Sequence, residues 1–138
     1  MIGLDTNILA RYYIDDDTDI EAAKQRLLAK SLIESGKEFM ICKTVLLELE
    51  WVMRGFYRFK STDVQQVLQH ILSLPNMTIE DRELVERALF SLAKGLDFAD
   101  ALHHSSYHQC ESLASFDDKK FARRSNKLAL IPRVIVPK

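Results

Sequence analysis

The sequence predicts an α/β fold with three layers, α/β/α, in which helices cover both faces of a central parallel sheet of four to five short strands. Two observations support this class. Short apolar runs alternate along the chain with longer stretches in which apolar residues recur at helical spacing. The 138 residues are close to the commonest size of one domain, and they contain no internal repeat and no Gly-, Pro- or Ser-rich linker. We therefore predict a single domain over residues 1–138.

The first third of the chain is expected to supply two strands separated by a helix. Met1–Leu4 (MIGL) is the first short apolar run, and Phe39–Cys42 (FMIC) is the second. Between them, apolar residues follow helical spacing from Ile20 until Ser35 and Gly36 interrupt the pattern.

The middle of the chain is expected to form two helices and a strand. The segment TVLLELEWVMRG predicts a helix that Gly55 closes. Ser61 begins a second helix, which ends before Pro75 because the residue preceding a proline avoids helical geometry. Met77–Ile79 (MTI) is the third candidate strand.

The last third is expected to complete the sheet. Asp81 is placed to cap a helix that runs to about Lys94, with Gly95 at the position after its C-cap. A further helix is predicted over residues 98–109 and a fourth strand over residues 112–115. Either ALI or VIV near the end supplies a fifth strand.

Composition describes a globular chain with nearly balanced charge. Hydrophobic residues make up 47% and charged residues 28%, which is typical of a fold with a packed core. The net charge of −1 excludes a polycation that binds nucleic acid through its overall charge. Two cysteines without CxxC spacing predict reduced thiols. Because we find neither a leader segment nor an apolar run of ~20 residues, we expect a cytoplasmic protein without membrane contact.

Two acidic residues follow predicted strands. Asp5 comes at the end of the first strand, and Asp117 follows the fourth. Parallel α/β sheets place their ligands beyond the carboxyl ends of the strands. Asp5 therefore has two open interpretations, either a cap that ends a strand and begins a helix or a member of a site assembled from distant segments.

Two further regions carry candidate acids. Glu48 is predicted to lie on an apolar helix face, where loss of hydration favours a functional role, whereas Glu50 pairs with Arg54 on a wet surface. Asp97 is well placed as an N-cap, and Asp100 projects from the first turn of the same helix. Of the adjacent acids 117 and 118, one is expected to enter the site and the other to cap the following helix, and we favour Asp117 for the site because it directly follows the strand.

Such a set of acids predicts a metal site. Two carboxylates about 4 Å apart repel each other by roughly 4 kcal/mol at an effective dielectric of 20. A hard dication, Mg²⁺ or Mn²⁺, relieves this repulsion and prefers oxygen ligands. Bases that begin beside Asp117 are suited to holding phosphates: Lys119, Lys120, Arg123 and Arg124. Together they favour metal-dependent phosphodiester cleavage.

Four motif segments follow one another along the chain: LDTNILARY, TVLLELEWV, DFADALHH and SFDDKKFAR. In their order and spacing they resemble the PIN-domain ribonucleases, in particular the VapC-type toxins of bacterial toxin–antitoxin (VapBC) pairs. The resemblance covers essentially the whole chain and implies a PIN-like fold. It carries the catalytic, metal-binding positions over to the acids already chosen, Asp5, Glu48, Asp100 and Asp117. It also places Asp97 near the metal, with Thr6, Asn7 and Ser115 supporting the site.

The resemblance further implies an endoribonuclease that uses Mg²⁺ or Mn²⁺, forms a homodimer and is inhibited by a VapB-like antitoxin. Two alternatives stay open. His104 and His108 have the i, i+4 spacing of a zinc-binding pair, with Asp100 one turn earlier, so a zinc-binding protein is one alternative. The other is a catalytically silent PIN-like binding module, against which the intact set of four acids argues.

Overall fold

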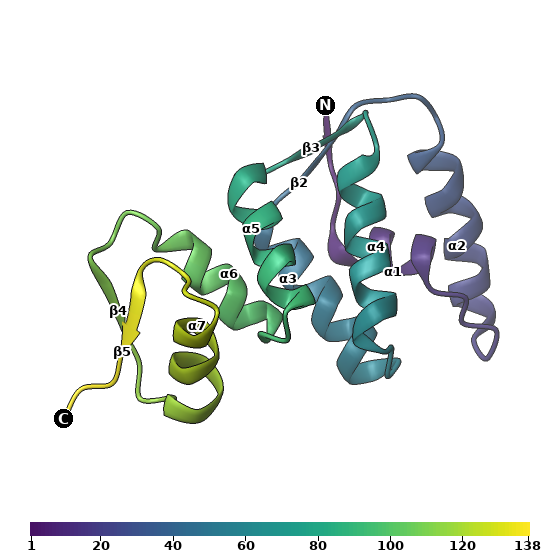
Figure 1. The fold of residues 1–138 in the computed structure, drawn as a ribbon. Coiled ribbons are helices and arrows are strands. Elements are labelled where there is room, and N and C mark those ends of the chain that lie inside the picture. Colours follow the sequence, from purple (N-terminus) through teal and green to yellow (C-terminus); the bar gives the residue numbers. More distant parts are fainter. The chain divides into compact units, whose positions relative to one another are not determined.

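The computed structural model describes all residues, 1–138, and confirms the α/β class. Seven α-helices and two short π-helical segments accompany five strands, all paired in parallel. The chain divides into two compact units, Met1–Glu80 and Asp81–Lys138 (Figure 1). The single domain over residues 1–138 stays a prediction. No helix has the length and apolar character needed to cross a bilayer.

The first unit contains a three-stranded sheet. Its strands are β1 (Ile2–Gly3), β2 (Phe39–Ile41) and β3 (Met77–Ile79), in the order β1-β2-β3. Phe39 pairs with Ile2 on one side and with Met77 on the other. Because all three strands run in the same direction, the residues that follow them emerge at one edge of this sheet.

Four α-helices belong to the first unit: α1 (Thr6–Tyr13), α2 (Ile20–Ile33), α3 (Lys43–Trp51) and α4 (Ser61–Ser73). Helix α1, for which the sequence analysis predicted no element, packs against α2 and α3. The end of α2 is as predicted, because Gly36 adopts the left-handed conformation (φ +83°) that stops a helix. The core includes fully buried side chains from helices and strands, among them Leu9, Phe39, Ile41, Leu46 and Leu49.

The predicted end of α3 is wrong. Instead of closing at Gly55, the chain continues from α3 into a π-helical turn, η1 (Val52–Phe56). The Tyr57 N–H donates to the Val52 carbonyl oxygen at 3.1 Å, which is the hydrogen bond over five residues that defines this turn. Gly55 lies inside the turn and is not among the residues with positive φ, so it does not act as a C-cap glycine.

The second unit has its own two-stranded sheet. Strands β4 (Ser112–Ala114) and β5 (Arg133–Ile135) pair in parallel, with Leu113 opposite Val134. The expected single central sheet is therefore replaced by sheets of three and two strands. The remaining elements are α5 (Arg82–Ala93), α6 (Phe98–Ser106), η2 (Asp118–Ala122) and α7 (Arg123–Lys127).

The helices of the second unit differ from prediction at two ends. Gly95 (φ +99°) follows α5 as expected, but Asp81 provides no side-chain cap at its start. Helix α6 stops at Ser106, three residues early. The hydroxyls of Ser105 and Ser106 donate to the Leu102 carbonyl, and such local bonds compete with helix propagation. Helices α5 and α6 pack closely against each other.

Candidate active site

Asp5 begins helix α1 and lies two residues after strand β1. Its Oδ1 accepts a hydrogen bond from the Thr6 N–H at 2.8 Å, so the carboxylate caps the helix. The side chain is exposed, and Oδ2 accepts no hydrogen bond within the chain. Both interpretations of this residue are therefore compatible, because one oxygen caps the helix while the other faces solvent.

Asp5 and Glu48 line one pocket of about 370 Å³ in the first unit, together with Thr6 and Asn7. The structure thus brings together four of the predicted site residues within this unit. Glu48 lies on α3, one element after β2, and it is exposed. The expectation that Glu48 sits on a dehydrated apolar face is wrong, since its carboxylate reaches the pocket without being buried.

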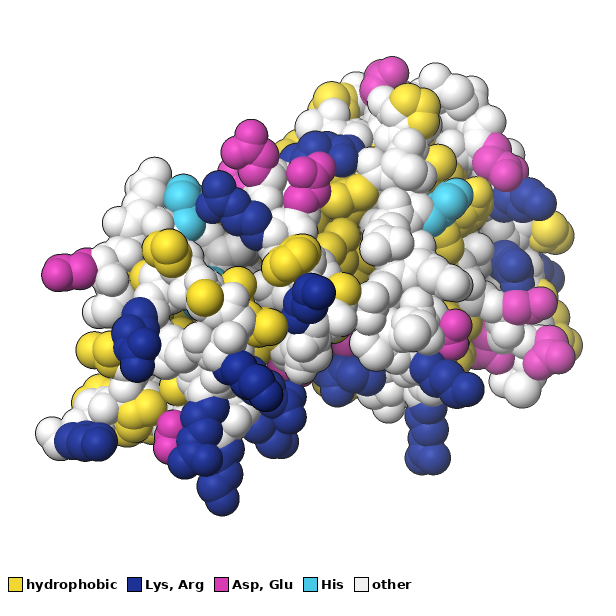
Figure 2. Space-filling view, in the orientation of Figure 1, with side chains coloured by type: hydrophobic (Ala, Val, Ile, Leu, Met, Phe, Trp, Pro, Cys, Tyr) yellow, Lys and Arg dark blue, Asp and Glu magenta, His cyan; other side chains and the backbone are white.

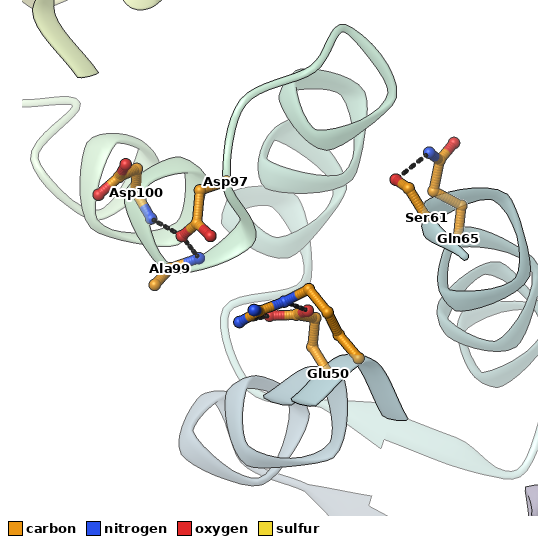
Figure 3. A network of polar contacts seen from close by, with 7 residues as sticks. Glu50, Ser61, Gln65, Asp97, Ala99 and Asp100 are labelled. Atoms are coloured by element: carbon orange, nitrogen blue, oxygen red, sulfur yellow. Dashed lines mark hydrogen bonds and ion pairs between the residues drawn. The ribbon is translucent and has the colours of Figure 1, made fainter. Parts of the chain in front are cut away.

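The buried acid of α3 is Glu50, which is only 3% exposed. Arg54 donates from Nε to the Oε2 of Glu50 at 2.7 Å, so the predicted pair is confirmed (Figure 3). The expected wet surface is wrong for the carboxylate, although the arginine side chain is 52% exposed. Glu50 is buried as one half of an ion pair, which gives it a structural role.

The hydroxyl of Thr6 is an unusual feature of this pocket. Thr6 is buried, and its Oγ1 has no hydrogen-bond partner. Buried hydroxyls nearly always have a partner, and an unsatisfied one costs about 1–3 kcal/mol. An orphaned oxygen directly beside Asp5 fits a pocket whose polar groups are completed by a bound ligand or water.

The second unit gathers three of the predicted acids. Burial raises the pKa of the Asp100 carboxyl above its usual range, and the nearby charges of Asp97 and Asp117 raise it further. His103 and Arg124 act in the opposite direction but do not cancel the effect. The three carboxylates are therefore close enough to repel one another, as the sequence analysis assumed.

Two of these acids are also helix caps. Asp97 accepts from the Ala99 and Asp100 N–H groups through Oδ1, which confirms its predicted capping position (Figure 3). Asp117, and not Asp118, caps the next helical segment, because its Oδ1 accepts from the Lys120 and Phe121 N–H groups. The predicted division of roles between acids 117 and 118 is thus wrong for the cap.

Neighbouring polar groups fix these acids in place. The Ser115 hydroxyl accepts from the Asp117 N–H at 3.0 Å, so Ser115 orders the turn that presents Asp117. Asp118 forms an ion pair with Arg123 at 3.1 Å, and Arg124 donates to the Gly95 carbonyl at 3.2 Å. Lys and Arg side chains gather over the part of this unit that holds α7 and the C-terminus (Figure 2). Those predicted to bind nucleic acid are all exposed: Lys119, Lys120, Arg123 and Arg124.

The histidine pair does not present a zinc site, because it belongs to no group of three or more His, Cys, Asp or Glu side chains that could hold a metal ion. The Nε2 of His104 lies 2.7 Å from the Pro132 carbonyl oxygen, to which it must donate, so this nitrogen has no lone pair for a metal. The Nδ1 of His108 lies 3.2 Å from the Ser105 carbonyl oxygen and donates there in the same way. His104 is buried as part of the packing of α6.

The donor set fits a hard dication in its chemistry, although the side chains form no preassembled metal centre. No three His, Cys, Asp or Glu side chains are arranged closely enough to hold a metal ion as they stand. Asp5, Asp97 and Asp117 each use Oδ1 for a cap and leave Oδ2 without a hydrogen bond. Carboxylate oxygens of this kind suit Mg²⁺ or Mn²⁺ and not the softer metals.

Four further side chains line the same pocket as Asp5 and Glu48 and were not predicted as site residues: Arg11, Trp51, Phe56 and Tyr57. Arg11 is the one base among the residues lining this pocket. Helical spacing could have predicted that two of them lie near Glu48, because Trp51 is three residues after it and Phe56 follows on the same segment. No pattern in the sequence predicts the π-helical turn that carries the latter.

Comparison with protein families matches residues 2–127 to the PIN domain. The match covers most of the chain, from strand β1 into helix α7. Proteins with this domain are generally nucleases, they typically depend on divalent metal ions, and they bind RNA. No curated protein matches the chain.

Proposed function

The chain belongs to the PIN domain family, and from that premise we propose that it is an endoribonuclease dependent on Mg²⁺ or Mn²⁺. The observation that carries the proposal is the repulsion around Asp100, whose carboxyl pKa is raised by burial and by two neighbouring acids. A protein gains nothing in stability from such an arrangement, so a function accounts for it better than folding does.

The acids have distinct parts in this proposal. The resemblance to PIN-domain ribonucleases assigns the dication to Asp5, Asp100 and Asp117, with Glu48 and Asp97 as further ligands. When bound, the dication supplies Lewis acidity, which lowers the pKa of water and offsets negative charge on the phosphate. Ser115 and the caps fix the carboxylates in orientation before any ligand arrives.

The bases have a separate part, which is to hold the RNA backbone. Lys119 and Lys120 extend from η2, directly after Asp117, and both are exposed. Exposed lysines bind phosphates with little sequence preference, so they position the strand without selecting bases. Raising the salt concentration should therefore weaken RNA binding more than it slows cleavage of bound RNA.

Cleavage of a single-stranded RNA tests the proposal. We expect Mg²⁺ or Mn²⁺ to support cleavage and EDTA to abolish it. Asp5→Asn and Asp100→Asn should still bind RNA but fail to cut it. Asp63→Asn is the matched control, because Asp63 is an exposed acid in the first turn of α4, outside the candidate site. Normal cleavage by both site variants would show that the acids are wrongly assigned.

We further propose that the protein is the toxin of a VapBC-type toxin–antitoxin pair and works as a homodimer in the cytoplasm. The resemblance of the four motif segments to VapC-type toxins supports this proposal. Induced expression should arrest bacterial growth, Asp5→Asn should not, and co-expression of a small open reading frame adjacent to the gene should restore growth. A mass in solution near twice 15.9 kDa would support the dimer.

A further inference from the structure

Two exposed aromatic side chains lie beside the candidate acids of the first unit. Trp51 is 58% exposed and Phe56 is 70% exposed, and both line the pocket that contains Asp5 and Glu48. Single exposed apolar side chains are common, but a pocket that combines them with converging polar groups is the default candidate for a binding site. Neither ring is needed for the core, which is already filled by other residues of α3.

The π-helical turn brings these two rings to the same pocket. In an α-helix, residues five apart are rotated by about 140° around the axis and point to different sides. A π-helical turn closes its hydrogen bonds over five residues, so residues five apart come nearly into line. Because the turn begins directly after Trp51, Phe56 reaches the pocket that Trp51 already lines.

The indole of Trp51 lies against the chain at Gly55. A Cβ added at Gly55 would lie 3.5 Å from Cε2 and 3.6 Å from Nε1 of Trp51, so the ring passes directly beside the glycine. The indole is thereby supported along the turn while more than half of its surface stays open to solvent. An indole that lies against the chain on one side and is open to solvent on the other offers a flat apolar face to a ligand.

The remaining side chains of the pocket suit a phosphate next to that face. Arg11 donates from Nε to Gln25 and from Nη1 to the Tyr57 hydroxyl at 3.5 Å. Hydrogen bonds from Thr18 and Tyr57 lower the pKa of the nearby Asp16 carboxyl, and the charge of Arg11 helps to lower it. The Tyr57 hydroxyl in turn donates to Asp16 at 3.0 Å, which fixes the phenol at the pocket wall. A base, two acids and an exposed aromatic pair therefore share one pocket.

We propose that Trp51 and Phe56 form a stacking surface for an unpaired RNA base adjacent to the phosphate that is cut. This inference rests on the proposed function, because it assigns the substrate class of the same site. Every base has a π-face, and aromatic side chains bind bases by stacking without reading their sequence. Bases in a duplex already stack on their neighbours and cannot offer that face, so the protein selects single-stranded RNA.

Tryptophan fluorescence gives a direct test, because Trp51 is the only tryptophan of the chain. The Asp100→Asn variant is titrated with a mixed-sequence oligoribonucleotide of about 12 nucleotides, and separately with the same strand in a duplex. We expect the single strand to quench the fluorescence and the duplex to leave it nearly unchanged. Free nucleotides at the same concentration control for collisional quenching.

Binding of a labelled oligoribonucleotide to variants gives the second test. In the Asp100→Asn background, Trp51→Ala should weaken binding of the single strand by about tenfold or more, whereas Trp51→Phe should retain most of it. Phe90→Ala is the matched control, because Phe90 is 59% exposed but belongs to α5 and does not line this pocket. It should bind as tightly as the parent.

The outcomes separate this inference from the proposed function. If RNA is cut but the single strand does not quench Trp51, or Trp51→Ala binds normally, the stacking surface is refuted and the nuclease stands. If the single strand quenches Trp51 of the Asp100→Asn variant but the parent protein never cuts RNA, the stacking surface stands and the nuclease is refuted. If Trp51→Ala binds RNA normally but loses binding to a second protein, the pair is a protein interface and the inference is wrong.

Discussion

Asp5 combines a capping role with a proposed catalytic role, and the two can be separated by substitution. Asparagine caps a helix about as well as aspartate, whereas alanine does not, at a cost of about 1 kcal/mol. Asp5→Ala should therefore lower the free energy of unfolding by about that amount, or roughly 3–5 °C in melting temperature for a protein of this size. Asp5→Asn should stay within a few tenths of a kcal/mol of the parent.

Cleavage should respond differently. Both variants lose a negative charge that the proposed metal site needs, so both should cut RNA about a hundredfold more slowly or worse. Asp5→Asn is the informative variant, because it is as stable as the parent and yet inactive. Urea unfolding followed by circular dichroism and cleavage of a labelled oligoribonucleotide measure the two effects on the same preparations.

Asp19 is the matched control for the cap. Its Oδ1 accepts from the Glu21 N–H at 3.0 Å at the start of α2, and it is not part of the pocket that Asp5 lines. Asp19→Ala should lose about 1 kcal/mol of stability and keep full activity. The reasoning is refuted if Asp5→Asn cuts normally, if it is as unstable as Asp5→Ala, or if Asp19→Ala is inactive.

Three further predictions concern stability. The pKa of Asp100 is raised by burial and neighbouring acids, so ionisation of this carboxyl lowers the stability of the protein as the pH rises. In metal-free protein, Asp100→Asn should therefore melt at a higher temperature than the parent at neutral pH. This gain should vanish below about pH 4, where the parent carboxyl is also neutral. Arg54→Ala leaves Glu50 buried without this ion-pair partner, so it should lower the free energy of unfolding, measured in urea, by about 2–3 kcal/mol. Arg26→Ala is the control, because Arg26 belongs to an exposed ion pair; it should lower the free energy of unfolding by less than about 0.5 kcal/mol. Asn126 bonds both to the N–H and to the carbonyl of one residue in β5, so Asn126→Ala should cost about 2 kcal/mol and loosen that strand in hydrogen exchange.

The sequence predicted the elements well where local chemistry decides them. Gly36 and Gly95 stop helices because only glycine adopts positive φ freely, and both were identified as helix ends. The first four predicted runs became strands, and of the two candidates for the fifth, only VIV overlaps a strand, β5. Pairing between strands is not local, and the division into sheets of three and two strands has no signature in the apolar runs themselves.

The errors at the candidate site have a common physical cause, which is that adjacent acids look alike in sequence. Glu48 and Glu50 both have apolar neighbours in α3, and only the helix phase decides which one is buried. Asp117 and Asp118 differ by one position, yet only the former reaches two backbone N–H groups. A one-residue difference in backbone geometry decides each case, and propensities do not resolve it.

Capping explains how so many acids persist in a marginally stable protein. Asp5, Asp97 and Asp117 each stand at a helical start, where unpaired N–H groups and the helix dipole stabilise a negative charge. Asp100, inside the first turn of α6, has no such bond from its side chain, and it is the one whose carboxyl pKa is raised. The caps therefore hold three carboxylates in fixed orientations without a metal, while burial and the repulsion between the acids raise the pKa of the fourth, Asp100. In the proposed nuclease, this division would let the fold form before a dication binds, and relief of the repulsion at Asp100 would favour that binding.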